Sequence, residues 1–247
     1  MPDFFLVGAP KAGTTSIFEL LKIHPQVFVP KYKEPNYYTD VGTQSRNVIN
    51  INSKKEYDRL YADAIEDQIT GDFSVSYLHA KDAPAKIYKD YPNSKIIIFI
   101  RDPVRRAFSH WQMDFREGFT KLDFIDAFNA DYEYLGKKGF CYSAMYYECS
   151  LYTKQINEYK KYFNNVLVLE FEKFFKNIDS NMVELYTFLN ISPLEINNKK
   201  SANEAGIAKN QVAKIIYQNS FIRKIAKIVF PEMLKIKLRK VILKKTN

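Results

Sequence analysis

The chain has 247 residues, 46% of them hydrophobic and 15% aromatic, which is enough to bury a substantial core in one large domain or in one domain with a short appendage. No apolar run approaches the ~20 residues that a membrane-spanning helix needs, which excludes an integral membrane protein of that kind. The formal net charge of +9 indicates anionic partners and leaves a nucleotide, a polyanionic glycan, a membrane surface or a nucleic acid as candidates.

Five apolar runs bounded by turn residues predict β-strands, at residues 4–9, 27–30, 68–74, 95–100 and 165–171. Helix-length patterns separate most of these runs and predict α-helices at 14–23, 55–64, 83–91, 103–115, 124–135, 150–163 and 182–189. This alternation predicts an α/β fold with a largely parallel sheet of about five strands and helices on both of its faces. The run "KIIIFI" is apolar without alternation, as expected for a central strand that is covered on both faces.

The two ends of the chain carry expectations about location and domain organisation. The first three residues lead directly into an apolar run, so we expect no cleavable signal ahead of it and a cytoplasmic protein. We expect an α/β domain over residues 1–195, followed by a polar loop and a basic helical extension over 196–247. Apolar residues of the extension recur at helical spacing at Ile222, Ile225, Ala226 and Val229. Such a helix either packs on the domain, which we favour, or lies on an anionic membrane surface.

The segment "GAPKAGTTS", residues 8–16, follows the first predicted strand and precedes the first predicted helix. Gly8 and Gly13 keep the spacing of the phosphate-binding loop G-x-x-x-x-G-K-[ST]. Thr14, however, stands where that loop has its lysine, and Lys11 lies inside the loop instead. Because backbone N–H groups and the helix dipole favour an anion at a helix start, the segment predicts a P-loop-like anion site with a displaced lysine.

Side chains of the loop add further donors to this site. Thr14, Thr15 and Ser16 carry hydroxyls, and Lys11 is placed to reach over the anion and contact a leaving-group oxygen. The alternative from the residues alone is a tight strand-to-helix turn with a Thr cap, in which Lys11 is merely solvated. The complete loop between an apolar strand and a clear helix favours the anion site.

A second phosphate site is predicted in "IIIFIRDPVRRAFSHW", where a strand ends and a helix begins. Asp102 suits the helix cap and Pro103 the first turn, which leaves Arg101 at the end of the strand. Ser109 lies about two turns into the helix, so Arg101 and Ser109 are placed to grip one phosphate between them.

Together these stretches resemble the donor site of the sulfotransferase family, whose members move a sulfuryl group from 3'-phosphoadenosine 5'-phosphosulfate to a hydroxyl or amine. The family's first motif, P-K-[SA]-G-T-[TS], is matched by residues 10–15, and its second, R-x-P-x-x-R-x-x-S, by Arg101, Pro103, Arg106 and Ser109. The resemblance implies that Arg101 and Ser109 hold the 3'-phosphate of this donor. It also implies that the 5'-phosphosulfate is held by Lys11, Ala12, Gly13, Thr14, Thr15 and Ser16.

Further stretches resemble the glycan branch of the family, which includes the heparan sulfate-type enzymes. "HPQVFVPKYKEPNYY" is similar to a segment in which a Lys-Glu pair precedes aromatics, and the match implies that Glu34 is the catalytic base and that the acceptor is a carbohydrate. "GDFSVSYL" resembles a Gly-Glu-x-Ser-Pro-x-Tyr segment near the acceptor, with Asp72 in place of Glu and Val75 in place of Pro. Apart from the resemblance, we expect the polar segment "NNKKSANEAG" to cover the nucleotide and to bring Lys200 near the 3'-phosphate. The resemblance extends over roughly residues 4–190.

The resemblance implies a mechanism of in-line displacement. Glu34 accepts the proton of the acceptor hydroxyl while that oxygen attacks sulfur, and Lys11 stabilises charge on the bridging oxygen as its bond to sulfur breaks. A sulfate ester joined to a phosphate carries less charge than a triphosphate, so no metal is required. Cys141 and Cys149 lack metal-ligand spacing, which agrees with that expectation.

Alternatives stay open at three places. Arg105 and Arg106 can form a solvated helix face while Arg101 pairs with a nearby carboxylate. Glu34 can form an exposed salt bridge with Lys31 or Lys33. A third alternative comes from the resemblance, since some small-molecule sulfotransferases use a histidine as the base. His79, just after "GDFSVSYL", is then the candidate, because His24 and His110 suit structural positions.

Two other classes of protein compete with a sulfotransferase. A nucleotide kinase of the P-loop type predicts a lysine at position 14 and a magnesium-binding acid, a role in which Asp102 would have to serve although it suits a helix cap better. A basic binding protein would dock on a membrane or nucleic acid through the tail, and we expect no nucleic acid partner. A protein tyrosine or a small alcohol remains an alternative acceptor.

Overall fold

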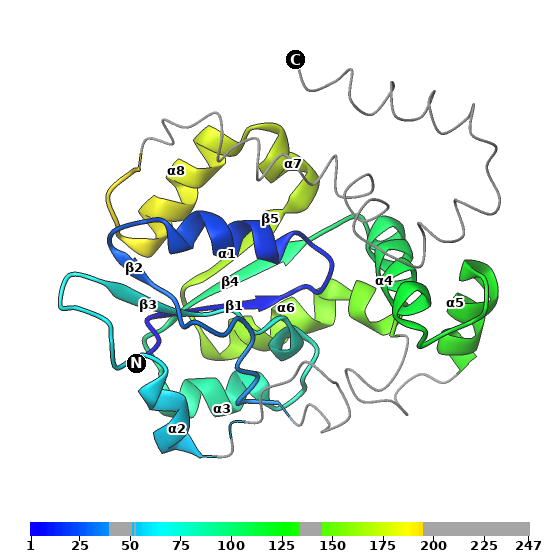
Figure 1. The fold of residues 1–247 in the computed structure, drawn as a ribbon, viewed down its shortest axis with the longest axis horizontal. Helices are drawn as coiled ribbons and strands as arrows, with labels where there is room; N and C mark the ends of the chain where they lie inside the picture. The colour runs from blue at the N-terminus through cyan, green and yellow to red at the C-terminus, as the bar shows by residue number, and fades with distance from the viewer. Residues whose placement is uncertain (40–50, 52, 134–144, 195–247) are drawn as a thin grey trace, which may run out of the picture. The chain divides into compact units, whose positions relative to one another are not determined.

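The protein is described by a computed structural model that covers residues 1–39, 51, 53–133 and 145–194 (Figure 1). Its centre is a five-stranded sheet in the order β2-β3-β1-β4-β5, and every neighbouring pair is parallel. The strands are β1 (Phe4–Gly8), β2 (Val27–Phe28), β3 (Ile69–Asp72), β4 (Lys95–Ile100) and β5 (Val166–Glu170). The predicted α/β fold with a parallel central sheet is confirmed.

Helices cover both faces of this sheet. In Figure 1, α1, α7 and α8 lie on one side and α3 and α6 on the other. The helices are α1 (Thr14–Lys22), α2 (Lys54–Arg59), α3 (Ala83–Asp90), α4 (Pro103–Glu117), α5 (Phe124–Glu133), α6 (Tyr152–Tyr162), α7 (Phe171–Lys176) and α8 (Ile178–Leu189), with short 3-10 helices at Val75–Leu78 and Glu148–Ser150. No helix in the part of the chain described above is long and apolar enough to cross a membrane.

Helix α7 is absent from the sequence prediction, which ended the last strand at Phe171 and began the next helix at Met182. In the structure the strand turns directly into α7, and Asn177, with φ −132° and ψ 63°, separates α7 from α8. The prediction was wrong here because no glycine or proline marks the boundary, and apolar residues continue from the strand into the helix.

The central strands β1 and β4 are buried on both faces, as expected for central parallel strands. Phe4 to Val7 of β1 and Ile96 to Phe99 of β4 have no exposed surface. Phe73 packs edge-on against Phe4, with ring centroids 5.6 Å apart, and against Phe18 of α1 at 5.1 Å. These contacts fasten α1 to one face and fix where the loop before it begins.

The strand order changes direction at β1. The chain moves from β1 through β2 and β3 on one side and then returns to place β4 on the other side of β1. The carboxyl ends of β1 and β4 therefore point to the same edge, where open parallel sheets bind ligands at the change of direction. The predicted loop at 8–16 and the segment at 101–109 meet at this edge.

Some predictions fall on residues outside the described ranges. These include the basic extension over 196–247 with Lys200, the end of the helix predicted at 124–135, and Cys141. The two-part domain division, the membrane contact and the cytoplasmic location stay predictions.

Candidate functional site

The loop between β1 and α1 is built for an anion by its backbone. Gly13 precedes α1 with φ 80°, and a Cβ atom there would lie 2.5 Å from the ring of Phe171, so glycine is required both by conformation and by space. Within the described residues, the N–H groups of Lys11, Gly13, Thr14 and Thr15 donate to no protein acceptor. The first turn of α1 also carries no acidic side chain. Unpaired donors at a helix start favour a phosphate or sulfate group.

The Lys11 ammonium lies over α4 and has a weak partner. Its Nζ atom is 3.6 Å from the sulfur of Met113, a poor acceptor, and this is its one hydrogen-bond contact among the described residues. Burial lowers the pKa of Lys11, and neighbouring arginines, Arg116 first among them, lower it further against the opposing charge of Asp114. An anion bound in the loop would supply the missing partner, because a negative charge favours the ammonium form.

Arg101 joins the two predicted phosphate sites. Its Nη1 atom donates to the carbonyl oxygen of Lys11 at 3.2 Å, and its guanidinium lies 4.7 Å from the ring centre of Phe171. Its buried Nε atom makes no hydrogen bond within the described chain, although it lies 3.5 Å from an oxygen of Glu172. The alternative pairing of Arg101 with a carboxylate therefore occurs, and Glu172 belongs to the helix that the sequence did not reveal.

The start of α4 follows the predicted cap chemistry. The Oδ1 atom of Asp102 accepts the N–H of Arg105 at 2.8 Å, and Pro103 is the first residue of the helix. Ser109 lies half-buried on the same helix, and its hydroxyl makes no hydrogen bond inside the described ranges. It is therefore free to bind a ligand, as the resemblance implies.

Arg106 corrects the expectation of a solvated helix face. Arg105 is exposed, but Arg106 is completely buried. Its Nε atom donates to the hydroxyl of Ser150 at 2.7 Å, and its Nη2 atom donates to the carbonyl of Tyr146 at 2.6 Å. Its Nη1 atom lies 3.2 Å from Nδ1 of His110, whose pKa is held below the usual range by burial. Arg106 thus anchors α4 to the segment at 145–150.

Glu34 lies in the segment after β2. Its carboxylate forms an ion pair with Lys33 at 2.7 Å, as the local alternative proposed, and a third of the side chain remains exposed. Such a surface pair is worth little and leaves the carboxylate accessible. A hydrogen bond joins Arg101 to Lys11 at the loop. The Glu34 segment is instead hydrogen-bonded, through Asn36, to Ser74 and Ser76.

Asp72, the residue that replaces Glu in the acceptor-site resemblance, is completely buried. Its carboxylate accepts hydrogen bonds from the hydroxyls of Tyr57, Ser74 and Tyr77. Burial raises its pKa to about 6, with a further contribution from the charge of Glu34, while the three hydroxyls oppose the shift. Asp72 therefore supports the segment from within and cannot itself touch an acceptor in this state.

The other two histidines, His24 and His79, have distinct surroundings. His24 uses both ring nitrogens, with Nε2 2.9 Å from the carbonyl of Ser192 and Nδ1 accepting the N–H of Gln26. The Nδ1 atom of His79 is buried without a hydrogen-bond partner in the described chain, and burial lowers the pKa of this side chain. A neutral imidazole with an unused nitrogen can accept a proton, so His79 stays the alternative base.

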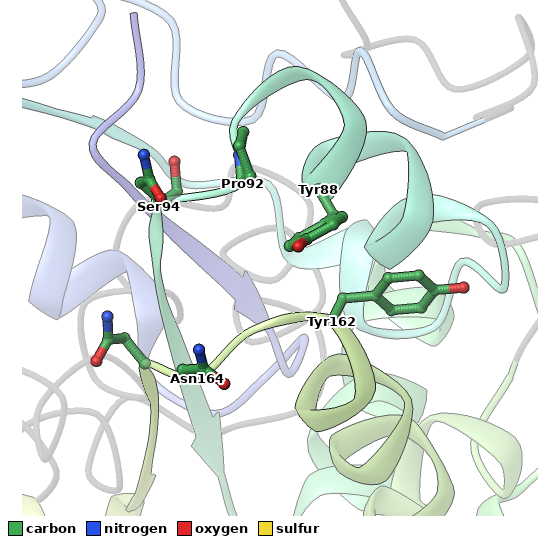
Figure 2. Close-up of a pocket in the computed structure, with 7 residues that line it drawn as sticks. Tyr88, Pro92, Ser94, Tyr162 and Asn164 are labelled. Carbon is green, nitrogen blue, oxygen red and sulfur yellow. The ribbon is translucent and has the colours of Figure 1, made fainter.

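Two pockets lie at the other edge of the sheet. Figure 2 shows one of about 230 Å³ at the amino ends of β4 and β5, and the residues that line it are Tyr88, Pro92, Asn93, Ser94, Tyr162, Asn164 and Asn165. No charged side chain lines it. The cationic groups Lys11 and Arg101 lie at the opposite edge, by the loop after β1. Among the described residues, no three His, Cys, Asp or Glu side chains come together as metal ligands.

Comparison with known proteins decides between the candidate classes. A family model described as a sulfotransferase domain matches residues 1–225. The chain belongs to this family. The resemblance seen in the two donor motifs is therefore confirmed at the level of the family.

The curated relatives of this sulfotransferase-family chain include enzymes named for glycans. Heparan sulfate glucosamine 3-O-sulfotransferase 3A1 of Mus musculus is 28% identical over 134 residues, which are 53% of this chain and 30% of that protein. Carbohydrate sulfotransferase 15 of Homo sapiens is 24% identical over 249 residues, which cover 78% of this chain and 44% of that protein. The chain spans less than half the length of these relatives.

Solved structures show the same fold. A sulfotransferase from Alicyclobacillus acidocaldarius superimposes with a TM-score of 0.72 at 26% identity, over 90% of this chain and 96% of the other. Mouse sulfotransferase SULT7A1, solved in complex with PAP, gives a TM-score of 0.55 at 18% identity, over 85% of this chain and 65% of the other.

Proposed function

We propose that this protein transfers a sulfuryl group from 3'-phosphoadenosine 5'-phosphosulfate to a hydroxyl or amine of a carbohydrate. The observation that carries the proposal is the cluster at the edge of β1 and β4, where Arg101 contacts the backbone of Lys11 beside unpaired loop amides. Family membership and the names of the glycan sulfotransferases among its relatives support the reaction and the acceptor class.

The donor residues suit a sulfated nucleotide with phosphates at two ends. The unpaired amides of the loop and the hydroxyls of Thr14, Thr15 and Ser16 would hold the 5'-phosphosulfate. Arg101 with Ser109 would hold the 3'-phosphate. These groups are hydrogen-bond donors or cations, and the first turn of α1 has no acid to repel an anion. The bound donor supplies the activated sulfuryl group. Lys200, also expected near the 3'-phosphate, lies outside the described residues.

Two side chains would carry out the transfer. Glu34 takes the proton from the acceptor as the acceptor oxygen or nitrogen forms its bond to sulfur, which requires Glu34 to part from Lys33. Lys11 holds its ammonium against the bridging oxygen, where negative charge develops as the bond to sulfur breaks. Its weak contact with Met113 leaves the ammonium available for that oxygen.

The kinase alternative loses support at Asp102. The carboxylate that a magnesium site would need caps α4 through the N–H of Arg105. Thr14 also occupies the position of the P-loop lysine. A protein tyrosine or a small alcohol remains the alternative acceptor within the sulfotransferase family.

Calorimetric titration with 3'-phosphoadenosine 5'-phosphate, beside 5'-AMP and beside ATP with magnesium, tests the donor site. We expect the bisphosphate to bind without metal and more tightly than 5'-AMP. Arg101→Ala should weaken binding of the bisphosphate ~10- to 100-fold, which is the contribution expected from hydrogen bonds between charged groups. Arg105→Ala, which removes a neighbouring exposed arginine, should leave affinity within about twofold because surface charges contribute little. Binding of ATP with magnesium and indifference to the 3'-phosphate would contradict the proposal.

A further inference from the structure

The segment that carries Glu34 has an unusual backbone. Glu34 has φ 67° and Asn36 has φ 53°, so two residues with side chains adopt the left-handed region within one turn. This region is unfavourable for residues other than glycine, although asparagine tolerates it better than glutamate does. The conformation that aims Glu34 must therefore be held by contacts elsewhere in the fold.

The side chain of Asn36 makes those contacts. Its Nδ2 atom donates to the main-chain carbonyl of Glu34 at 2.8 Å, and its Oδ1 atom accepts the hydroxyl of Ser76 at 2.5 Å. Its own N–H donates to the hydroxyl oxygen of Ser74 at 3.0 Å. Asn36 is 8% exposed, so these bonds are shielded from water. The amide thereby fastens the Glu34 turn to the 3-10 helix at Val75–Leu78 and the residue before it.

Asp72 fixes the direction of the hydrogen bonds behind Asn36. Its Oδ1 atom accepts the hydroxyl of Ser74 at 2.6 Å, and its Oδ2 atom accepts the hydroxyls of Tyr57 and Tyr77 at 2.6 and 3.0 Å. A serine hydroxyl has one proton to donate. Because Ser74 gives that proton to Asp72, its oxygen is left to accept the N–H of Asn36.

From this chain of contacts we infer that Asn36 is a positioning residue for Glu34, held in place by Asp72 through Ser74. The inference rests on the proposed role of Glu34 as the base. Asn36 acts on the backbone of Glu34 and does not touch the reacting atoms. Its loss lets the turn relax and moves the carboxylate away from the acceptor.

Substitution by glycine separates positioning from backbone preference. Asn36→Gly keeps the left-handed conformation accessible and removes the amide, so a role limited to backbone conformation would be preserved. We expect kcat for sulfuryl transfer to fall ~10- to 100-fold, as for small misplacements of a catalytic group, with the Kd for the bisphosphate within about twofold of wild type. Ser76→Ala, a smaller change that frees Oδ1 of Asn36, should lower kcat in the same direction.

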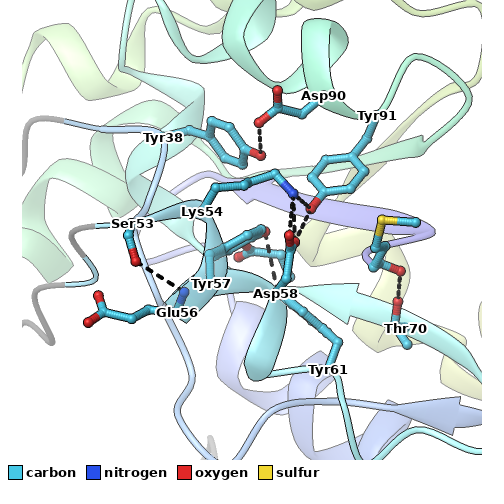
Figure 3. A network of polar contacts seen from close by, with 12 residues as sticks. Tyr38, Ser53, Lys54, Glu56, Tyr57, Asp58, Tyr61, Thr70, Asp90 and Tyr91 are labelled. Carbon is cyan, nitrogen blue, oxygen red and sulfur yellow. Dashed lines mark hydrogen bonds and ion pairs between the residues drawn. The ribbon is translucent and has the colours of Figure 1, made fainter.

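Tyr38→Phe is the matched control. Tyr38 lies in the same segment and is also buried, but its hydroxyl donates to Asp90 at 2.8 Å (Figure 3). Asp90 is not among the hydrogen-bond partners of Asn36. We expect this variant to keep the wild-type kcat. A loss in Tyr38→Phe equal to that in Asn36→Gly would overturn the proposal, since any polar change in the segment would then have the same effect.

A cycle with Glu34→Gln tests whether Asn36 acts through Glu34. We expect Asn36→Gly to lower kcat in the wild-type background and to cause no further loss in the Glu34→Gln background. Equal losses in both backgrounds overturn this inference alone, because Asn36 would then act independently. A Glu34→Gln variant as active as wild type overturns the proposed base and this inference with it, so the two failures are distinguishable.

Amide hydrogen exchange supplies a readout that does not depend on catalysis. In Asn36→Gly the peptide spanning residues 33–38 should exchange several-fold faster than in wild type, while the β4 peptide at residues 95–100 exchanges at the wild-type rate. Unchanged exchange at residues 33–38 would show that the amide does not hold the turn and would overturn the inference.

Discussion

At the scale of single residues, Lys11 is placed for chemistry at a cost to stability. Its ammonium is largely buried against Met113, and burial lowers its pKa. A buried cation with a thioether for a partner is unfavourable in the free protein, and such local costs are typical of functional sites. A neutral side chain at this position would therefore make the folded protein more stable, whereas a charged one serves anion binding and sulfuryl transfer.

Replacing Lys11 by methionine should separate these two demands. We expect Lys11→Met to lower kcat ~100-fold or more, as for the loss of a donor to a developing oxyanion, with a free energy of unfolding no lower than that of wild type. Single-turnover kinetics and urea unfolding measure the two quantities. Lys31→Met, at an exposed position in the same half of the chain, is the control and should match wild type in both. An unchanged rate in Lys11→Met would remove Lys11 from the mechanism.

The buried carboxyl group of Asp72 should make the stability of the folded protein depend on pH. Its folded-state pKa of about 6 lies above the ordinary value of 3.8, so its contribution to stability is complete below the unfolded pKa and is lost as the pH rises through about 6. The difference corresponds to about 3 kcal/mol as an order of magnitude. Relative to Asp72→Asn, which does not titrate, wild type should therefore be more stable at about pH 4 than at about pH 7.

Urea unfolding of both proteins across this pH range measures the effect. Burial also raises the pKa of Asp114 to about 6. Because Asp114 is present in both proteins, its effect on stability cancels when they are compared. A pH-independent difference between wild type and Asp72→Asn would contradict the prediction.

At the scale of elements, the loop is shaped by packing between α1 and α7. The rings of Phe171 and Phe175 occupy the space where a side chain at position 13 would lie. The same Phe171 ring supports the guanidinium of Arg101. Helix α7 thus contacts both predicted phosphate sites and holds them in position relative to each other, although it contributes no residue to either motif.

Two glycines with the same backbone conformation allow this packing to be tested. Gly13 and Gly118 have φ 80° and 81°, but a Cβ atom at Gly118 would meet nothing within 4 Å. Gly118→Ala should lower the free energy of unfolding by only ~1 kcal/mol, because alanine is unfavourable in the left-handed conformation. Gly13→Ala adds steric overlap with Phe171 and should lower the free energy of unfolding by ~2 to 4 kcal/mol. It should also weaken binding of the bisphosphate. Chemical unfolding and calorimetry measure both, and equal costs would contradict the packing argument.

At the scale of the whole molecule, the donor site joins parts of the sheet that are distant in sequence. The loop after β1 and the start of α4 meet because the strand order places β4 beside β1. A ligand that contacts both should stabilise the folded state as a unit.

Thermal unfolding in the presence of 3'-phosphoadenosine 5'-phosphate measures this linkage. At 100 times its Kd, the bisphosphate should raise the free energy of unfolding by about 2.7 kcal/mol. The same concentration should stabilise Arg101→Ala by much less, while Arg105→Ala should respond as wild type does. A bisphosphate that binds without raising the unfolding temperature would contradict the prediction, because it would then bind the folded and unfolded states alike.

The sequence by itself determined the features that depend on near neighbours. Five apolar runs became the five strands, the glycines and the helix start gave the loop, and Asp102 with Pro103 began α4 as predicted. The donor motifs also sufficed for the family. These inferences succeed because periodicity, capping and turn chemistry act over a few residues.

The tertiary structure decided what each polar residue touches. Arg106 carries the same local signal as Arg105, yet it is buried because its partners come from residues 145–150. Likewise, the contact of Arg101 with Glu172 and the support of Asn36 by Asp72 join segments far apart in the chain. Burial and hydrogen-bond partners depend on which segments the fold brings together, and no local pattern in the sequence contains that information.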